Sequence, residues 1–250
     1  MLKHSFLFLE KISSRKERSI WQQGINDWQD FLKAGKIKGI AKEKKYYYDR
    51  KIKETQQALL EENSHYFVDK LPKKEMWRLY EYFKDDCCFL DVETDSYGKI
   101  IVVGISNYFS TNTFVQGMNL ERKMLERELQ KYKVLITFNG SSFDLPKLRK
   151  QFSLIIDIPH IDLKPLCVKL ELKGGLKEVE KILNLKRPQH LQGSPVDLWK
   201  AFHASGDREY LELLIEYNRE DIENLKGVME WCYQKLYLIK DAQKKYREMH

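Results

Sequence analysis

The chain contains little glycine and little proline for its length. Only 12 of its 250 residues are glycine and 6 are proline, and no long low-complexity tract occurs. Hydrophobic residues make up 42% of the sequence, which is enough to form a core and excludes a largely disordered chain. We therefore expect a globular protein nearly throughout, with one large domain or one average domain and a smaller companion.

Cysteine is also scarce, and the four cysteines include no Cys-x-x-Cys pair of the kind that binds zinc. A zinc site is therefore not expected. Cys87 and Cys88 precede an apolar strand and should lie in or near the core as small hydrophobic side chains. Together with Cys167 and Cys232, they are expected to be reduced thiols in a cytoplasm.

Long hydrophobic runs are missing as well. The apolar run from Phe6 to Leu9 is too short for the core of a signal peptide or for a membrane span, so no membrane partner is expected. The net charge is strongly positive, at +7, with an isoelectric point near 9.0. A basic chain weakly favours a polyanionic partner.

The positive charge is concentrated between residues 33 and 53. Nine lysines and arginines crowd this stretch, opposed only by Glu43 and Asp49, and three consecutive tyrosines follow Lys45. Basic residues beside aromatic rings can hold phosphates and stack on bases. Lys42, Lys44 and Lys45 are therefore candidate substrate-binding residues. A solvated helix face whose tyrosines pack on the domain explains the pattern equally well.

Residues 1–86 are predicted to form a helical N-terminal extension. Asn26 and Asp27 can cap a helix, a charged helix should run through the forties and fifties to Leu60, and Pro72 suits the first turn of another. Residues 87–250 are predicted to form the second domain, because the pattern changes at Cys87 to apolar runs that end in polar residues.

The order of elements after residue 87 predicts an α/β fold with a mixed five-stranded sheet flanked by helices. Three strands with short links come first, at CCFLDVET, KIIVVGISNY and NTFVQG. A helix, the strand KVLITFNG, a helix from Asp144 to Phe152 and the strand IIDIPHIDL follow, and helices complete the chain through about Leu236. The strands after the first three should be parallel to the first.

Four acids and one tyrosine lie at the ends of these predicted elements. Asp91 and Glu93 share one face of a strand, and Tyr217 and Asp221 share one face of a helix. Asp144 starts the helix after the neighbouring strand, so three segments could bring their carboxylates into one pocket. Such a pocket needs cations, and hard divalent metals such as Mg²⁺ or Mn²⁺ suit oxygen ligands best.

The segments LDVET, NGSSFD and YNRED resemble the three motifs of the RNase H-like DEDD exonucleases, and the Tyr-x-x-x-Asp spacing resembles their tyrosine-type branch. The segments HIDL, GGLKEVEKILNLKR and LWKAFHASGDREYLELLIEYNREDIENL more closely resemble the YprB-like RNase H-like proteins. This similarity covers residues from about 87 to 237 and implies an RNase H-like fold.

The resemblance also implies roles for the five residues. Asp91, Glu93 and Asp221 would ligate a first Mg²⁺ or Mn²⁺ ion, and Asp91 would bridge to a second with help from Asp144. Tyr217 would position the attacking water. A phenol with an ordinary pKa near ~10 is a poor base at neutral pH, so the metals should do most to activate the water.

Other residues are candidates with two interpretations each. Thr94 is placed to contact substrate or to cap the strand end, and Asn139 to contact substrate or to shape the turn, which we favour. Lys147, Arg149 and Lys150 could hold phosphates or be solvated. An aromatic wedge at Phe143, an outer-shell role for Asp162 and a role as base for His160 are further options, with a structural role favoured for each.

The leading functional hypothesis is a metal-dependent nuclease that acts as a 3′→5′ exonuclease on single-stranded DNA or RNA. The exonuclease direction comes from the resemblance, and an endonuclease remains a variant. One alternative is a module that binds nucleic acid, or recruits a helicase or nuclease, without turnover. Another is a phosphodiesterase acting on small nucleotides. The residue types leave open the choice between DNA and RNA and the oligomeric state.

Overall fold

The computed structural model describes residues 1–191 and 193–248, the last six of them by their backbone. The chain forms two compact units, one of Asp85–Cys232 and one that combines Met1–Lys84 with the chain from Tyr233 onward. This division differs from the predicted domains at the C-terminal end, which clusters with the N-terminal segment. The two domains themselves stay a prediction.

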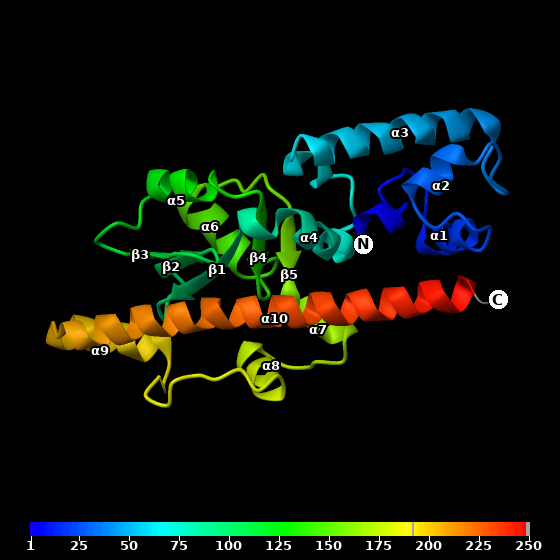
Figure 1. The fold of residues 1–250 in the computed structure, drawn as a ribbon. Coiled ribbons are helices and arrows are strands. Elements are labelled where there is room, and N and C mark those ends of the chain that lie inside the picture. The colour runs from blue at the N-terminus through cyan, green and yellow to red at the C-terminus, as the bar shows by residue number, and fades with distance from the viewer. Residues whose placement is uncertain (192, 249–250) are drawn as a thin grey trace. The chain divides into compact units, whose positions relative to one another are not determined.

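The unit that begins at Asp85 is built on a mixed five-stranded sheet (Figure 1), as predicted. The strand order is β3-β2-β1-β4-β5, with bounds of Cys87–Thr94 for β1, Ile100–Ser106 for β2, Thr111–Val115 for β3, Val134–Thr137 for β4 and His160–Asp162 for β5. Neighbouring strands are antiparallel from β1 to β3, whereas β4 is parallel to both β1 and β5.

Helices cover both faces of this sheet. The core on one face packs Cys88, Leu90 and Val92 of β1 against helices α5 (Arg122–Leu129) and α6 (Asp144–Phe152). The core on the other face includes residues of α9 (Pro195–Ser205) and α10 (Arg208–Glu248). Because side chains alternate along a strand, Asp91 and Glu93 project to the face that α10 covers.

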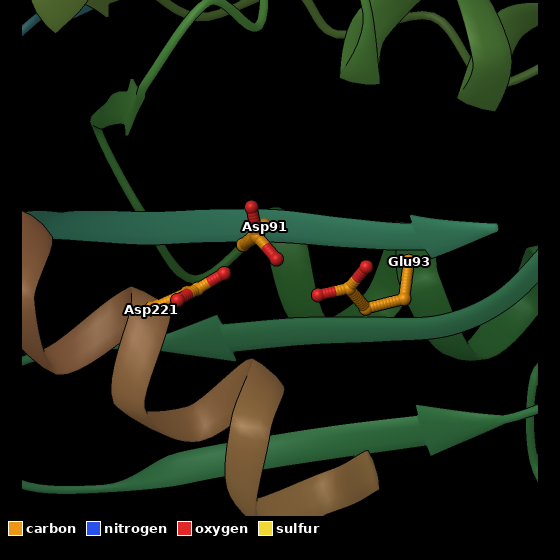
Figure 2. Close-up of side chains that lie close together, drawn as sticks. All are labelled: Asp91, Glu93 and Asp221. Atoms are coloured by element: carbon orange, nitrogen blue, oxygen red, sulfur yellow. The ribbon is translucent and has the colours of Figure 1, made fainter. Parts of the chain in front are cut away.

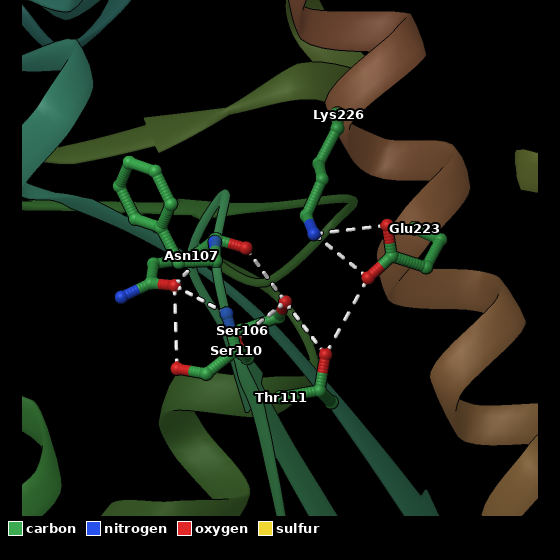
Figure 3. A network of polar contacts seen from close by, with 7 residues as sticks. Ser106, Asn107, Ser110, Thr111, Glu223 and Lys226 are labelled. Atoms are coloured by element: carbon green, nitrogen blue, oxygen red, sulfur yellow. Dashed lines mark hydrogen bonds and ion pairs between the residues drawn. The ribbon is translucent and has the colours of Figure 1, made fainter.

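A polar network ties α10 to the end of the β2–β3 hairpin (Figure 3). The hydroxyl groups of Ser106 and Thr111 lie 2.9 Å apart, and Thr111 Oγ1 donates to Glu223 Oε1 at 3.4 Å. Glu223 also accepts from Lys226 Nζ at 2.7 Å. Asn107 Oδ1 accepts two backbone N–H groups of the hairpin turn, each at 2.8 Å. These bonds fix the part of α10 that directly follows the YNRED motif to the β2–β3 hairpin.

The last strand is much shorter than the predicted segment IIDIPHIDL. Strand β5 has three residues, and α7 (Leu163–Lys169) follows it directly, before α8 (Leu176–Ile182). Pro159 stands immediately before β5, where it accepts a bond from Leu135 N–H at 2.9 Å. Because proline has no N–H of its own, it suits the edge of a strand better than its interior.

The unit that contains the N-terminus is helical, as the sequence predicted. Its elements are η1 (Leu2–His4), α1 (Ser14–Trp21), α2 (Trp28–Lys33), α3 (Lys42–Leu60), η2 (Ser64–Phe67), η3 (Lys73–Leu79) and α4 (Tyr80–Phe83), with η4 (Lys84–Asp86) at its boundary. Asp27 caps α2 as expected, whereas Pro72 precedes a 3₁₀ helix rather than an α-helix. Phe6, Phe31 and Tyr48 form a fully buried aromatic cluster at its centre.

All four cysteines are buried and unbridged, in agreement with the prediction for Cys87 and Cys88. Cys167 and Cys232 place their Sγ atoms 3.8 Å apart. The cytoplasmic location stays a prediction. Within the described residues, no helix combines the length and the apolar character needed to cross a membrane.

Candidate active site

Three carboxyl groups converge between β1 and α10 (Figure 2). One carboxylate oxygen each from Asp91, Glu93 and Asp221 lies within 4.8 Å of the other two. The first two residues share one face of β1, and the third approaches from the helix that covers this face. The structure therefore joins two of the three motif segments at one point.

A glycine lets α10 come this close to the sheet. Gly104 of β2 pairs with Asp91 of β1, and a Cβ on it would lie 2.1 Å from Asn218 Oδ1 and 2.2 Å from Ile222 Cδ1. In the space left open, Asn218 Nδ2 donates to Asp91 Oδ2 at 2.8 Å. Sequence reasoning missed Asn218, although it stands next to Tyr217 in the YNRED motif.

Asp144 lies beside the three carboxyl groups and does not belong to the closest cluster. It occupies the first position of α6 and is 3% exposed. Its Oδ1 atom is buried and has no hydrogen-bond partner among the described residues. Its charge raises the pKa values of both Asp91 and Glu93, so the three groups share one electrostatic environment.

The burial of these acids opposes their ionisation. Burial and the neighbouring Glu93 raise the pKa of Asp91 well above its usual range. Burial, followed by the charges of Asp221 and Asp144, raises the pKa of Glu93 to about 8. Burial raises the pKa of Asp144 to about 7 and that of Asp221 to about 6, although Arg187 counteracts the rise at Asp221. A positive charge placed among them would favour their ionised forms.

Arg187 supplies part of that positive charge, and sequence reasoning assigned it no role. Its guanidinium group pairs with Asp221 and, at 2.9 Å, with Glu180 of α8. Lys177 of α8 also lowers the pKa of Glu93 through its charge. All three residues belong to GGLKEVEKILNLKR, one of the segments that resemble the YprB-like proteins. The resemblance therefore marked these residues, but it did not indicate their charge interactions with the acids.

Tyr217 lies beneath these two cations. It is 6% exposed, and its ring centroid is 4.8 Å from Lys177 Nζ and 5.1 Å from Arg187 Cζ. Burial, with the charges of Asp221 and Glu93, raises the pKa of the phenol further above its ordinary value. The group therefore keeps its proton at neutral pH, in accord with a positioning role rather than a role as general base.

The turn between β4 and α6 is organised by Asp162. Its carboxylate accepts the N–H groups of Asn139 at 2.8 Å and Ser141 at 3.1 Å. Asn139 adopts a left-handed conformation with φ of 66°, and its carbonyl accepts from Ser142 N–H. These contacts favour the turn-shaping interpretation of Asn139. His160 likewise has a structural partner, since its Nε2 lies 2.8 Å from Thr137 Oγ1.

The remaining candidates near β1 and α6 lie as follows. Thr94 ends β1, where the register with β2 shifts between Glu93 and Thr94. Lys147 Nζ donates to Gly98 O at 2.8 Å, which turns this lysine toward the loop after β1. Arg149 is exposed on α6. Their contacts with substrate stay predictions.

The basic stretch of residues 33–53 divides between structural and exposed side chains. Lys42 is exposed at the first position of α3, and Lys44 lies 5.6 Å from the ring centroid of Tyr48. Lys45 differs from the prediction. It is 5% exposed, pairs with both carboxylate oxygens of Asp49 at 2.7 Å and lies over the Phe31 ring, so its ammonium group is committed to the core of this unit.

The acidic cluster fits a divalent metal ion. Its donors are carboxylate oxygens, which suit Mg²⁺ and Mn²⁺, and a cation bound among them would favour the ionised forms that burial and mutual repulsion oppose. Oδ1 of Asp144 is buried and has no hydrogen-bond partner among the described residues, so it is a further oxygen that could bind a metal ion. Asp91, Glu93, Asp144 and Asp221 are therefore the residues that could hold metal.

A comparison with protein families agrees with this geometry. A model described as the RNase_H superfamily matches residues 88–233, more than half of the chain. The chain belongs to the RNase H superfamily. The match spans β1 through most of α10 and so includes every acid of the cluster. It confirms the RNase H-like part of the resemblance, whereas the tyrosine-type DEDD branch stays a prediction.

Among solved structures, the RNase H-like chain is similar to the family B DNA polymerase from the hyperthermophilic archaeon Pyrobaculum calidifontis. The two are 12% identical, with a TM-score of 0.47, and the match covers 58% of this chain and 24% of the polymerase. No curated protein matches the sequence. The family assignment therefore rests on the match to the superfamily model.

Proposed function

We propose that this RNase H superfamily protein is a metal-dependent nuclease that removes nucleotides from the 3′ end of single-stranded DNA or RNA. The observation that carries the proposal is the convergence of Asp91, Glu93 and Asp221, whose carboxylate oxygens lie within 4.8 Å of one another. The 3′→5′ direction is supported by the resemblance of YNRED to the tyrosine-type exonuclease motif.

In this proposal, Asp91, Glu93 and Asp221 would hold one divalent ion, and Asp91 and Asp144 would hold a second. Bound Mg²⁺ or Mn²⁺ would supply positive charge for the attacking and leaving oxygens of the phosphodiester. Asn218 orients Asp91 through its bond to Oδ2. Such outer contacts keep a ligating carboxylate in a single orientation and tune its affinity for metal.

The residues around the acids have separate tasks. Tyr217 holds its proton and offers a hydroxyl group that orients the attacking water. Arg187 pairs with Asp221 and Glu180, which stabilises the negative charges of α8 and α10. A guanidinium group beside the carboxylates is also well suited to bind a phosphate oxygen of the substrate.

The test is cleavage of a 5′-labelled single-stranded oligonucleotide by the purified protein with Mn²⁺, with Mg²⁺ and with EDTA. We expect a ladder that shortens from the 3′ end with either metal and no cleavage in EDTA. Asp221→Asn should reduce the rate at least about 100-fold, because it removes a ligand charge. Glu212→Gln, an exposed change on the same helix, should cleave like the wild type.

Other outcomes would contradict specific parts of the proposal. Cleavage of a circular single strand would overturn the exonuclease direction and leave a nuclease. Salt-sensitive binding of nucleic acid that survives loss of all four acids, without cleavage of DNA or RNA, would show that the protein is a binding module and not an enzyme. Turnover restricted to mononucleotide esters would indicate a small-nucleotide phosphodiesterase.

A further inference from the structure

A groove lies between the β1–β2 turn and helix α6. It has a volume of about 520 Å³, and its lining includes Tyr97, Lys99, Phe143, Lys147, Lys150 and Gln151. The segments that form both walls lie next to the acidic residues in the sequence. Phe143 immediately precedes Asp144, and Tyr97 follows Glu93 by four residues. The groove is thus built from segments that flank the acidic residues in the sequence.

Hydrogen bonds fix the two walls to each other. Gln151 of α6 accepts from Ile100 N–H at 2.8 Å and donates to Ile100 O at 3.2 Å. Lys147 Nζ, one turn earlier on α6, donates to Gly98 O at 2.8 Å. Since these bonds join α6 to the β1–β2 turn at two points, the groove is formed before any ligand arrives.

The turn itself presents an aromatic ring to solvent. Asp95 Oδ1 accepts the N–H groups of Tyr97 and Lys99, each at 2.9 Å, which closes the turn. The side chain of Tyr97 at its tip is 94% exposed. An aromatic ring held out in this way contributes almost nothing to the core, whereas it offers its faces to a planar partner.

The groove combines two aromatic rings with three lysines. Phe143 on the opposite wall is 37% exposed, and Lys147 Nζ lies 5.2 Å from its ring centroid. Lys99 and Lys150 are exposed. Among the described residues that line the groove, none is acidic. Its charge thus complements a chain of anions, and its rings complement unpaired bases.

We propose that this groove binds a single-stranded oligonucleotide, with a base stacked on Tyr97 and the neighbouring phosphates held by Lys99, Lys147 and Lys150. The proposal rests on the proposed nuclease function, for which the groove would hold the single strand to be cleaved. Stacking needs bases that are free of a complementary strand, so a duplex fits the groove poorly.

The test measures binding in EDTA, so that no hydrolysis occurs. The probe is a fluorescently labelled oligothymidylate of about 12 nucleotides, with an oligouridylate of the same length as a second arm. Tyr97→Ala should weaken the binding of both about tenfold. The matched control is Phe109→Ala, an 83% exposed aromatic of the β2–β3 turn, which should bind like the wild type.

Salt dependence tests the lysines separately. Lys150→Gln should reduce the slope of log K against log salt concentration by about 0.7, the value for one phosphate contact with a single strand. Lys123→Gln, an exposed change on α5, should leave the slope unchanged. Equal slopes for Lys150→Gln and the wild type, or equal affinities for Tyr97→Ala and the wild type, would overturn the groove proposal.

The two proposals fail in distinguishable ways. Oligonucleotide binding that depends on Tyr97, without metal-dependent cleavage, would refute the nuclease and retain the groove. Metal-dependent cleavage by the wild type, together with wild-type binding by Tyr97→Ala, would support the nuclease and refute the groove. If oligoglutamate of equal charge competes as well as the oligonucleotide, the groove recognises acidic peptides and the proposal is wrong.

Discussion

The central feature at the residue scale is a shortage of positive charge among buried acids. Three carboxyl groups converge at the site with a fourth, that of Asp144, beside them, and Arg187 pairs directly with Asp221. Its second partner, Glu180, is also buried. Arg187 therefore binds Oδ1 of Asp221, a carboxylate that a metal ion would also use, so the two cations would compete for its negative charge.

Replacing Arg187 separates its effect on stability from its effect on metal binding. Arg187→Met should lower the free energy of unfolding in EDTA by about 2 kcal/mol, because Glu180 and Asp221 lose their buried partner. The same change should raise the affinity for Mn²⁺ about tenfold, since a competing positive charge is removed. Urea denaturation and calorimetric titration measure the two quantities.

The control for this change is Arg149→Met on the exposed face of α6, which should alter neither quantity. An unchanged Mn²⁺ affinity in Arg187→Met would show that Arg187 does not compete with metal. A protein that is destabilised without any gain in affinity would mark Arg187 as a structural residue only.

At the element scale, the site depends on how closely α10 approaches the sheet. The approach is set at Gly104, where a side chain would collide with Asn218 and Ile222. Both partners are fully buried, so neither has room to move aside. Gly104 thus controls the position of the helix that delivers Asp221.

Gly104→Ala tests this control. The added methyl group should push α10 outward and lower the free energy of unfolding by about 3 kcal/mol, as overpacking does in a dense core. Displacement of Asp221 should also weaken Mn²⁺ binding. Gly35→Ala is the matched control, because no atom lies within 4 Å of its new Cβ, and it should stay within about 0.5 kcal/mol of the wild type. Equal stability of the two variants would contradict the packing argument.

On the scale of the whole molecule, the acids couple folding to pH. The pKa of Glu93 is about 8 in the folded protein, against 4.5 for an ordinary glutamate. Between these values the folded state binds a proton that the unfolded state has released. Stability therefore falls as pH rises through this window, the opposite of the behaviour of a carboxylate in an ion pair.

Urea denaturation in EDTA at about pH 5 and about pH 8 checks this dependence. The free energy of unfolding of the wild type should fall relative to that of Glu93→Gln as pH rises, because glutamine stays neutral throughout. With saturating Mn²⁺ the difference should reverse, since metal binds the ionised carboxylate and releases the proton. Parallel pH profiles of wild type and Glu93→Gln in EDTA would refute the assignment of the buried proton.

Much of the fold was predictable because the signals are local. The strand alternation at FLDVET and the helical spacing at YNRED placed Asp91, Glu93 and Asp221 on the correct faces. Asp162 and His160 also have the structural contacts that we favoured for them. The short β5 was missed, because an apolar run resembles a longer strand until its neighbours are known.

By itself, the sequence determined the types and order of the elements and the acids available for metal binding, since periodicity and composition are carried by neighbouring residues. Only the tertiary structure decided that Asn218 orients Asp91, that Arg187 pairs with Asp221 and that Lys45 is buried. Each of these depends on packing and on charge compensation between side chains, which sequence pattern alone did not reveal. For Asn218 and Arg187 the partners are also far apart in the chain.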